Sequence, residues 1–156
     1  MKEPFTIRIA EPADDAARAA LLAPTYGSDA QTLASEAAEI RARYRQFGDL
    51  APGLIGWVAR DRTGQIIGTL EASIRLFANG CESVGILFIE GIAVDDAVRQ
   101  TGIGTALVET AAQWAKTQGI SELASDAHLE DSATQHWHLA MGFEVTERTV
   151  CFRRPV

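Results

Sequence analysis

The stretch from Gly85 to Gln118 restricts the fold most, because it combines a buried strand, a glycine-containing turn and a helix in direct succession. Residues 85–94 form an almost continuous apolar run, which is typical of a central strand. Residues 102–118 place apolar side chains at three- and four-residue intervals, which predicts an amphipathic helix. The turn Arg99-Gln100-Thr101-Gly102-Ile103-Gly104 joins them. A strand that leads through a tight turn into a covering helix predicts a sheet with helices packed on it.

The rest of the chain alternates strands and helices with no linker or internal repeat, so we expect a single domain over residues 1–156. Before Gly85, the patterns predict a strand at 5–9, a helix after Pro12, a helix from Ser28 or Asp29 to about Phe47 that Gly48 ends, and a hairpin of strands at 55–60 and 65–75. After Gly119 they predict a strand at 120–125, a helix from Asp131 or Ser132 to about Met141, and two strands between Phe143 and Arg154. This order, β-α-α-β-β-β-α-β-α-β-β, predicts an α/β (α+β) fold with a mixed central sheet and helices on both faces.

Composition narrows the classes of partner. Hydrophobic residues make up 47% of the chain, but no apolar run approaches the roughly 20 residues that span a bilayer, so we expect no membrane association. The formal net charge of −7 disfavours nucleic acid and favours a cationic ligand. Cys81 and Cys151 lack metal-ligand spacing, and the N-terminus lacks the features of a signal peptide. We therefore expect a cytoplasmic protein without a metal.

The turn before the second half of the chain has the features of an anion-binding loop. Gly102 and Gly104 allow the backbone to approach a ligand closely, and the helix that follows points its unpaired N–H groups and positive dipole end at the same place. A purely structural turn can carry the same glycines, so the turn alone leaves both interpretations open. It is not a Walker A loop, because no Gly-Lys-Ser/Thr follows, and it lacks the third glycine of a dinucleotide-binding fingerprint.

Glu90-Gly91 interrupts the apolar central strand. A glycine beside a charged residue inside a strand indicates a β-bulge, and a bulge would separate this strand from its neighbour. Unpaired backbone groups in such a gap can bind an amide-bearing arm, such as pantetheine. The alternative for Glu90, a glutamate at a sheet edge that points at water, fits so apolar a strand less well.

The strand, the Arg-x-x-Gly-x-Gly turn, the helix and strand that follow, and the helix ending in Gly142-Phe143 resemble the GNAT acetyltransferase superfamily over nearly the whole chain. A narrower resemblance is to aminoglycoside 6'-N-acetyltransferases. It is carried by Glu71-Ala72-Ser73-Ile74-Arg75, Asn79-Gly80, Phe88-Ile89-Glu90-Gly91-Ile92, Ala124-Ser125-Asp126, and Gly142-Phe143 with Thr146-Glu147-Arg148. The resemblance implies acetyl-CoA as co-substrate and a homodimer. The residues that it implies for acetyl-CoA binding are Ile92, Val94, Arg99, Gln100, Thr101, Gly102, Ile103, Gly104 and Thr105.

The resemblance also places the acidic residues of the acceptor site at Glu90 and Asp126. Acyl transfer to an amine requires the ammonium to lose a proton, which a nearby carboxylate can accept directly or through water. We expect Glu90 to be this base and Asp126 to orient the cation, although the roles could be exchanged or shared. A backbone N–H near Ile92 would polarise the thioester carbonyl. His138 stands where many of these enzymes have a tyrosine that protonates the thiolate, so it is either a general acid or a packing histidine.

The N-terminal half, which usually forms the acceptor pocket, matches the aminoglycoside enzymes less well. Tyr26 is the expected aromatic wall, Phe77 stands where a tyrosine is frequent, and Glu71, Glu90 and Asp126 complete the predicted acceptor site. The leading hypothesis is acetylation of the 6'-amine of an aminoglycoside by direct attack in a ternary complex. The alternatives are acetylation of a polyamine, small amine or peptide amine, and non-catalytic acyl-CoA sensing.

Overall fold

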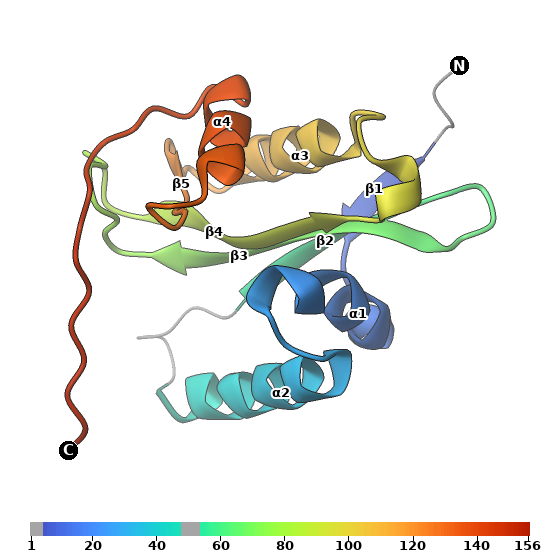
Figure 1. The fold of residues 1–156 in the computed structure, drawn as a ribbon, viewed down its shortest axis with the longest axis horizontal. Coiled ribbons are helices and arrows are strands. Elements are labelled where there is room, and N and C mark those ends of the chain that lie inside the picture. Colours follow the sequence, from blue (N-terminus) through green and yellow to red (C-terminus); the bar gives the residue numbers. More distant parts are fainter. Residues whose placement is uncertain (1–4, 48–53) are drawn as a thin grey trace.

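A five-stranded sheet forms the centre of the computed structural model, which describes residues 5–47 and 54–156. The strands follow the order of the chain: β1 (Thr6–Ile9), β2 (Leu54–Arg60), β3 (Ile66–Arg75), β4 (Ile86–Val94) and β5 (Leu123–Ala124). The first four pair antiparallel, whereas β4 and β5 pair parallel. Figure 1 shows α1 (Asp15–Tyr26) and α2 (Ala30–Phe47) on one face of the sheet, with α3 (Ile103–Thr117) and α4 (Ser132–Ala140) on the other. The predicted mixed sheet with helices on both faces is confirmed.

The main core lies between the sheet and α3. Helical spacing puts Ile103, Leu107, Ala111 and Ala115 on one side of α3, where they pack against Leu70, Ala72, Leu87 and Ile89 of the sheet. Gly68 allows the helix to approach, because a Cβ at that position would lie 2.8 Å from Cγ2 of Ile103. From Gly68 to Ile74, the even-numbered positions of β3 therefore face α3, and the odd-numbered side chains from Thr69 to Arg75 face the other way.

The opposite face of β3 carries a row of polar side chains: Thr69, Glu71, Ser73 and Arg75. Arg18 of α1 is 7% exposed; its Nε donates to Oγ1 of Thr69 (3.2 Å), and its Nη2 lies 3.3 Å from Oε1 of Glu71. Gly56 on β2 makes room for this buried guanidinium, since a Cβ there would lie 2.3 Å from Arg18 Nη2. A buried cation with these partners ties α1 to the polar row.

Aspartates begin two of the helices. Asp29 accepts from the backbone N–H of Thr32 (2.9 Å) ahead of α2, and Asp131 accepts from the N–H of Thr134 (3.0 Å) ahead of α4. Both positions were among the predicted caps, and Ser28 makes no such bond. Gly48, predicted to end α2, lies outside the described residues.

Two predictions about the C-terminal third are wrong in detail. The strand predicted at 120–125 is reduced to the two residues of β5. The two strands predicted between Phe143 and Arg154 do not form, and residues 144–156 are exposed. The alternating side chains suit a strand, but a strand also needs a partner, and the two residues of β5 are a short edge on which to pair. Figure 1 shows this segment leaving α4 and running past the end of the sheet as an extended chain.

Within the described residues, no helix has both the length and the apolar character needed to cross a bilayer.

Candidate active site

The predicted bulge is present on β4 at Glu90. Opposite β3, Gly91 pairs with Glu71 and Ile89 pairs with Ala72, so Glu90 has no partner residue in the ladder. The Glu90 carbonyl oxygen accepts a hydrogen bond from the Tyr26 hydroxyl at 2.7 Å. Gly91 makes this contact possible, because a Cβ there would lie 2.1 Å from the same hydroxyl oxygen. The bulge is thus fixed by the last residue of α1.

The Glu90 side chain is held by two residues of the neighbouring strand. Its Oε1 accepts from the Ser73 hydroxyl, from Arg75 Nε at 3.2 Å and from Arg75 Nη2 at 2.8 Å, and its Oε2 accepts from Arg75 Nη2 at 2.9 Å. The Arg75 guanidinium lies over the Phe88 ring, 3.4 Å from its centre. Register explains the cluster: Ser73 pairs directly with Phe88, and alternation puts Arg75 and Glu90 on the same face.

Three carboxylates act electrostatically on the Tyr26 hydroxyl. Burial, with a further contribution from the negative charges of Glu71, Glu90 and Asp126, raises the pKa of Tyr26 to about 12. Glu71 is paired with Arg18, and Glu90 is paired with Arg75. Asp126, which follows β5, is exposed and makes no hydrogen bond or ion pair within the described part of the chain. The structure therefore groups the predicted acceptor residues Tyr26, Glu71, Glu90 and Asp126.

β4 and β5 pair over only two positions, Leu87 with Leu123 and Phe88 with Ala124. Directly beyond them, the Ser125 hydroxyl lies 3.4 Å from the carbonyl oxygen of Ile89 and 2.9 Å from Nε2 of His138. The β4–β5 ladder therefore ends two residues before the bulge at Glu90. His138 of α4 contacts Ser125 at this end of the ladder.

The hydrogen bonds of His138 define its neutral tautomer. Nδ1 lies 2.8 Å from the Thr134 carbonyl oxygen, which can only accept, so Nδ1 carries the hydrogen. In the neutral ring Nε2 therefore accepts from Ser125, and it can donate a proton only when the ring is protonated. The ring also packs edge-on against Trp137 and Phe143, with centroids 4.9 and 5.3 Å away. His138 thus both packs and holds a directed polar contact.

The turn before α3 has the backbone that its glycines suggest. Gly102 has φ +90° and Gln100 has φ +62°, both in the left-handed region. Gly104 lies inside α3, where a Cβ would meet its nearest neighbours at an ordinary 3.9 Å. Its packing therefore does not require glycine, but the missing side chain leaves the first turn of α3 uncovered. No side chain caps α3, in contrast to α2 and α4, so the N–H groups of its first turn remain available.

The remaining residues of the turn form local contacts. The Thr101 hydroxyl donates to the Val98 carbonyl oxygen at 2.7 Å, and Arg99 makes an exposed ion pair with Asp96 at 2.7 Å. Ile92 and Val94 lie in β4 opposite Leu70 and Gly68, between the bulge and this turn. The predicted acetyl-CoA residues therefore form one continuous stretch from the bulge to the start of α3.

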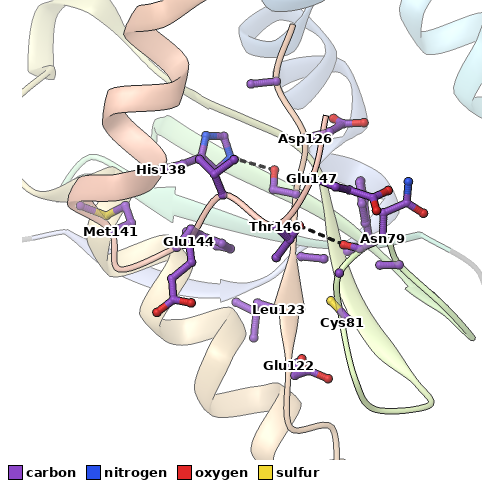
Figure 2. A pocket seen from close by; sticks show the side chains of 18 of the residues that line it. Asn79, Cys81, Glu122, Leu123, Asp126, His138, Met141, Glu144, Thr146 and Glu147 are labelled. Carbon is purple, nitrogen blue, oxygen red and sulfur yellow. Dashed lines mark hydrogen bonds between the residues drawn. The ribbon is translucent and has the colours of Figure 1, made fainter. Parts of the chain in front are cut away.

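A groove of about 900 Å³ lies at the β5 edge, between the sheet, α4 and the C-terminal segment. Figure 2 shows Asp126 and His138 at one end of it and Glu122 and Cys81 at the other. Phe77, which is 73% exposed, and Arg75 also line the groove. Phe77 and Asp126 thus line the same groove, whereas Tyr26 does not line it.

Among the described residues, no group of three or more His, Cys, Asp or Glu side chains is placed to hold a metal ion.

The residues predicted for the site from sequence do not include four that lie there in the structure: Ser73, Arg75, Ser125 and Arg18. Ser73 and Arg75 lie in a segment where polar residues recur at every second position, which is a readable sign of a shared face. Arg18 lies in an Ala-rich helix and has no comparable sign. Ser125 precedes Asp126, but nothing local indicates its contact with a histidine 13 residues later.

A family model for the acetyltransferase (GNAT) family matches residues 19–143, which include the polar row, the bulge, the glycine turn and His138. The chain belongs to the GNAT acetyltransferase family. It is 39% identical over 116 residues to an aminoglycoside N(6')-acetyltransferase type 1 of Klebsiella aerogenes, covering 69% of this chain and 76% of that protein. It is also 36% identical over 155 residues to a protein of the same name from Stenotrophomonas maltophilia, covering 97% of this chain and 94% of the relative.

Solved structures agree with this family membership. The aminoglycoside acetyltransferase AAC(6')-Iy, in complex with the bisubstrate analogue CoA-S-monomethyl-acetylneamine, superposes with a TM-score of 0.81 at 30% identity. That match covers 98% of this GNAT chain and 99% of the other. The CoA complex of the same enzyme gives a TM-score of 0.82 at 29% identity.

Proposed function

We propose that this GNAT protein transfers the acetyl group of acetyl-CoA to an aminoglycoside, at its 6'-amino group. The observation that carries the proposal is that the Tyr26 hydroxyl binds the bulged strand at Glu90, where the charges of Glu71, Glu90 and Asp126 also act on it. Arg18 and Arg75 balance two of these three carboxylates, so the net negative charge that remains is that of the exposed Asp126. A negative site attracts a polycation, and aminoglycosides are polycations. The relatives named above supply the substrate class and the position of the amine.

The donor side of the proposal depends on backbone groups. The uncapped first turn of α3, together with the left-handed Gly102 and the bare Gly104, suits a pyrophosphate, which helix N–H groups bind directly. Arg99, Gln100, Thr101, Ile103 and Thr105 complete this cradle in the proposal. The edge of β4 at Ile92 and Val94, which lies beyond the residues that pair with β5, suits the pantetheine arm.

In the proposed reaction, the acceptor nitrogen attacks the acetyl carbonyl carbon directly. The ammonium first passes one proton to a carboxylate, and the free amine then forms the new C–N bond. As the C–S bond breaks, the nitrogen loses its second proton to solvent, which leaves a neutral amide. Glu90 is the proposed proton acceptor because it lies at the bulge, and Asp126 holds the cation because it has no competing partner among the described residues. The departing thiolate takes a proton from His138 when that ring is protonated.

The test is a thiol-release assay with kanamycin or tobramycin and acetyl-CoA, followed by identification of the acetylated amine in the product. We expect release that depends on the antibiotic and a product modified at the 6' nitrogen. Activity with spermidine or a peptide amine, and none with either antibiotic, would move the assignment to the alternative acceptors. Glu90→Gln should lower kcat by about 100-fold or more while acetyl-CoA binding is retained. A sensor would bind acetyl-CoA and show no turnover with any amine.

The proposal includes a homodimer in the cytoplasm, where acetyl-CoA is available. Exposed apolar side chains gather on the C-terminal segment, with Val150 at 77% and Phe152 at 93% exposure. Leu76 and Val84, beside the end of the sheet, are 64% and 72% exposed. Side chains of this kind on an extended segment favour burial against a second copy. Both cysteines are free thiols, which suits a reducing compartment.

Light scattering on the full chain tests the dimer. We expect twice the mass of one chain, and Phe152→Ser with Val150→Ser should shift the mass toward that of one chain. Val156→Ser is a matched control, because it changes an exposed apolar residue at the chain end. A single-chain mass at the concentrations of the activity assay would contradict the proposal.

A further inference from the structure

Four side chains beside the bulge form a cluster of contacts that the proposed reaction does not by itself require. Ser73, Arg75, Phe88 and Glu90 form a closed set on one face of β3 and β4. Ser73 is 5% exposed and Phe88 is 6% exposed, so two members are part of the packed interior. The other two project from this base toward the acceptor side. The cluster therefore joins a rigid support to the carboxylate proposed to act on the acceptor.

The two carboxylate oxygens of Glu90 accept different numbers of hydrogen bonds. Oε1 accepts three: from Ser73, Arg75 Nε and Arg75 Nη2. Oε2 accepts one, from Arg75 Nη2 at 2.9 Å. Because a carboxylate oxygen has two main lone-pair directions, Oε1 is saturated and Oε2 retains capacity for one further donor. The arrangement leaves one defined oxygen for an incoming N–H group.

Arg75 is itself restrained in two directions. The Phe88 ring lies 3.4 Å below its guanidinium, and the carboxylate meets its Nε and Nη2 edge. Stacking and a two-point edge contact are geometries that a lysine cannot reproduce. An exposed ion pair in itself contributes little to stability, and the Arg75 side chain is 42% exposed. A role in orienting the carboxylate accounts for the arrangement better than a role in folding.

We propose that Arg75 is a positioning residue for the acetyl transfer: held flat on Phe88, it works with Ser73 to fill Oε1 of Glu90 and to present Oε2 to the acceptor ammonium. This inference rests on the proposed function, since it needs an amine acceptor at Glu90. Arg75 acts through Glu90 and not on the acceptor directly.

The first experiment compares kcat and the KM values of Arg75→Gln, Arg75→Lys and Ser73→Ala with those of the wild-type chain, with tobramycin as acceptor. A displacement of a catalytic group by about 1 Å can cost about 100-fold, so we expect kcat to fall roughly 10- to 100-fold in Arg75→Gln, and less in the other two. The KM for acetyl-CoA should not change, because the donor stretch runs in the other direction from the bulge. Arg62→Gln, in the exposed turn between β2 and β3, is the matched control for the lost charge.

The second experiment is a double-variant cycle with Glu90→Gln. If Arg75 acts through Glu90, Arg75→Gln has almost no further effect on kcat once Glu90 is replaced. Equal losses in both backgrounds, or a kcat for Arg75→Gln within about twofold of wild type, would overturn the inference. If Arg75→Gln does not fold, the same cycle is measured with Ser73→Ala and Glu90→Gln, because Ser73 also donates to Oε1 of Glu90. The proposed function is tested separately by whether the wild-type chain turns over tobramycin at all. The cycle compares only the kcat of each variant with the kcat of the wild type.

Discussion

Replacement of Gly91 by alanine tests how the bulge is held. Gly91 has no left-handed φ, so alanine is compatible with its backbone. Its new methyl group would, however, lie 2.1 Å from the Tyr26 hydroxyl oxygen, 3.0 Å from Cζ of the same ring and 3.3 Å from Cδ2 of Leu22. The tyrosine must move away, and its hydrogen bond to the Glu90 carbonyl oxygen is lost.

The expected cost has two parts. Loss of a hydrogen bond contributes about 0.5 to 1.5 kcal/mol, and an extra methyl group in a packed site contributes about 1 to 3 kcal/mol. We therefore expect Gly91→Ala to lower the free energy of unfolding by about 2 to 4 kcal/mol. Tyr26→Phe removes only the hydroxyl and should cost about 1 kcal/mol.

Urea unfolding of the wild type, both single variants and the double variant measures these values. In the Tyr26→Phe background the closest atom has been removed, so Gly91→Ala should cost at least about 1 kcal/mol less than in the wild type, an interaction energy in the usual range for contacting residues, about 0.5 to 3 kcal/mol. Strict additivity, or a cost for Gly91→Ala of less than about 0.5 kcal/mol, would refute the described contact between α1 and the bulge.

Three further predictions concern charge and helix ends. Ultraviolet titration of the two tyrosines should show one ionising near pH 12, and Tyr26→Phe should remove that step. Because the pKa of Tyr26 in the folded chain is raised, its contribution to stability is fully present below about pH 10 and is lost as the pH rises toward 12. Arg18→Met removes a buried cation from between Thr69 and Glu71 and should destabilise the protein by about 3 kcal/mol or more in urea unfolding. Asp131→Ala removes the cap of α4 and should lower Tm by a few degrees in a thermal melt; an unchanged Tm would contradict the capping role.

The donor half of the site could be predicted from sequence because its signals are local. A glycine at the left-handed position, an apolar strand before it and an amphipathic helix after it are all read within 34 consecutive residues, 85–118. The bulge at Glu90 was predictable for the same reason, since a charged residue and a glycine side by side disturb a strand wherever it pairs. Backbone groups perform the proposed binding there, so side-chain partners did not have to be known.

The partners of Glu90 could not be predicted, because they depend on register. Ser73 and Arg75 meet Glu90 only if Ser73 pairs with Phe88, and a shift by one residue would turn both side chains to the α3 face. The alternation of polar residues on β3 shows that they share a face, but not which residue of β4 they reach. The contact of Ser125 with His138 has a similar origin, since it depends on where α4 lies relative to β5.

The C-terminal segment was predicted wrongly for a different reason. Alternating side chains predicted two strands after Phe143, yet in the single chain Thr146 makes its hydrogen bond to the Asn79 carbonyl oxygen (3.2 Å) and the residues beyond are exposed. Periodicity reports which side chains favour one face, whereas strand formation also requires a free edge of matching length. β5 supplies only two residues of such an edge. The proposed homodimer would resolve this mismatch, because a second copy can cover the apolar side chains that one chain leaves exposed. The Phe152 and Val150 variants therefore examine the fold of this segment and the assembly together.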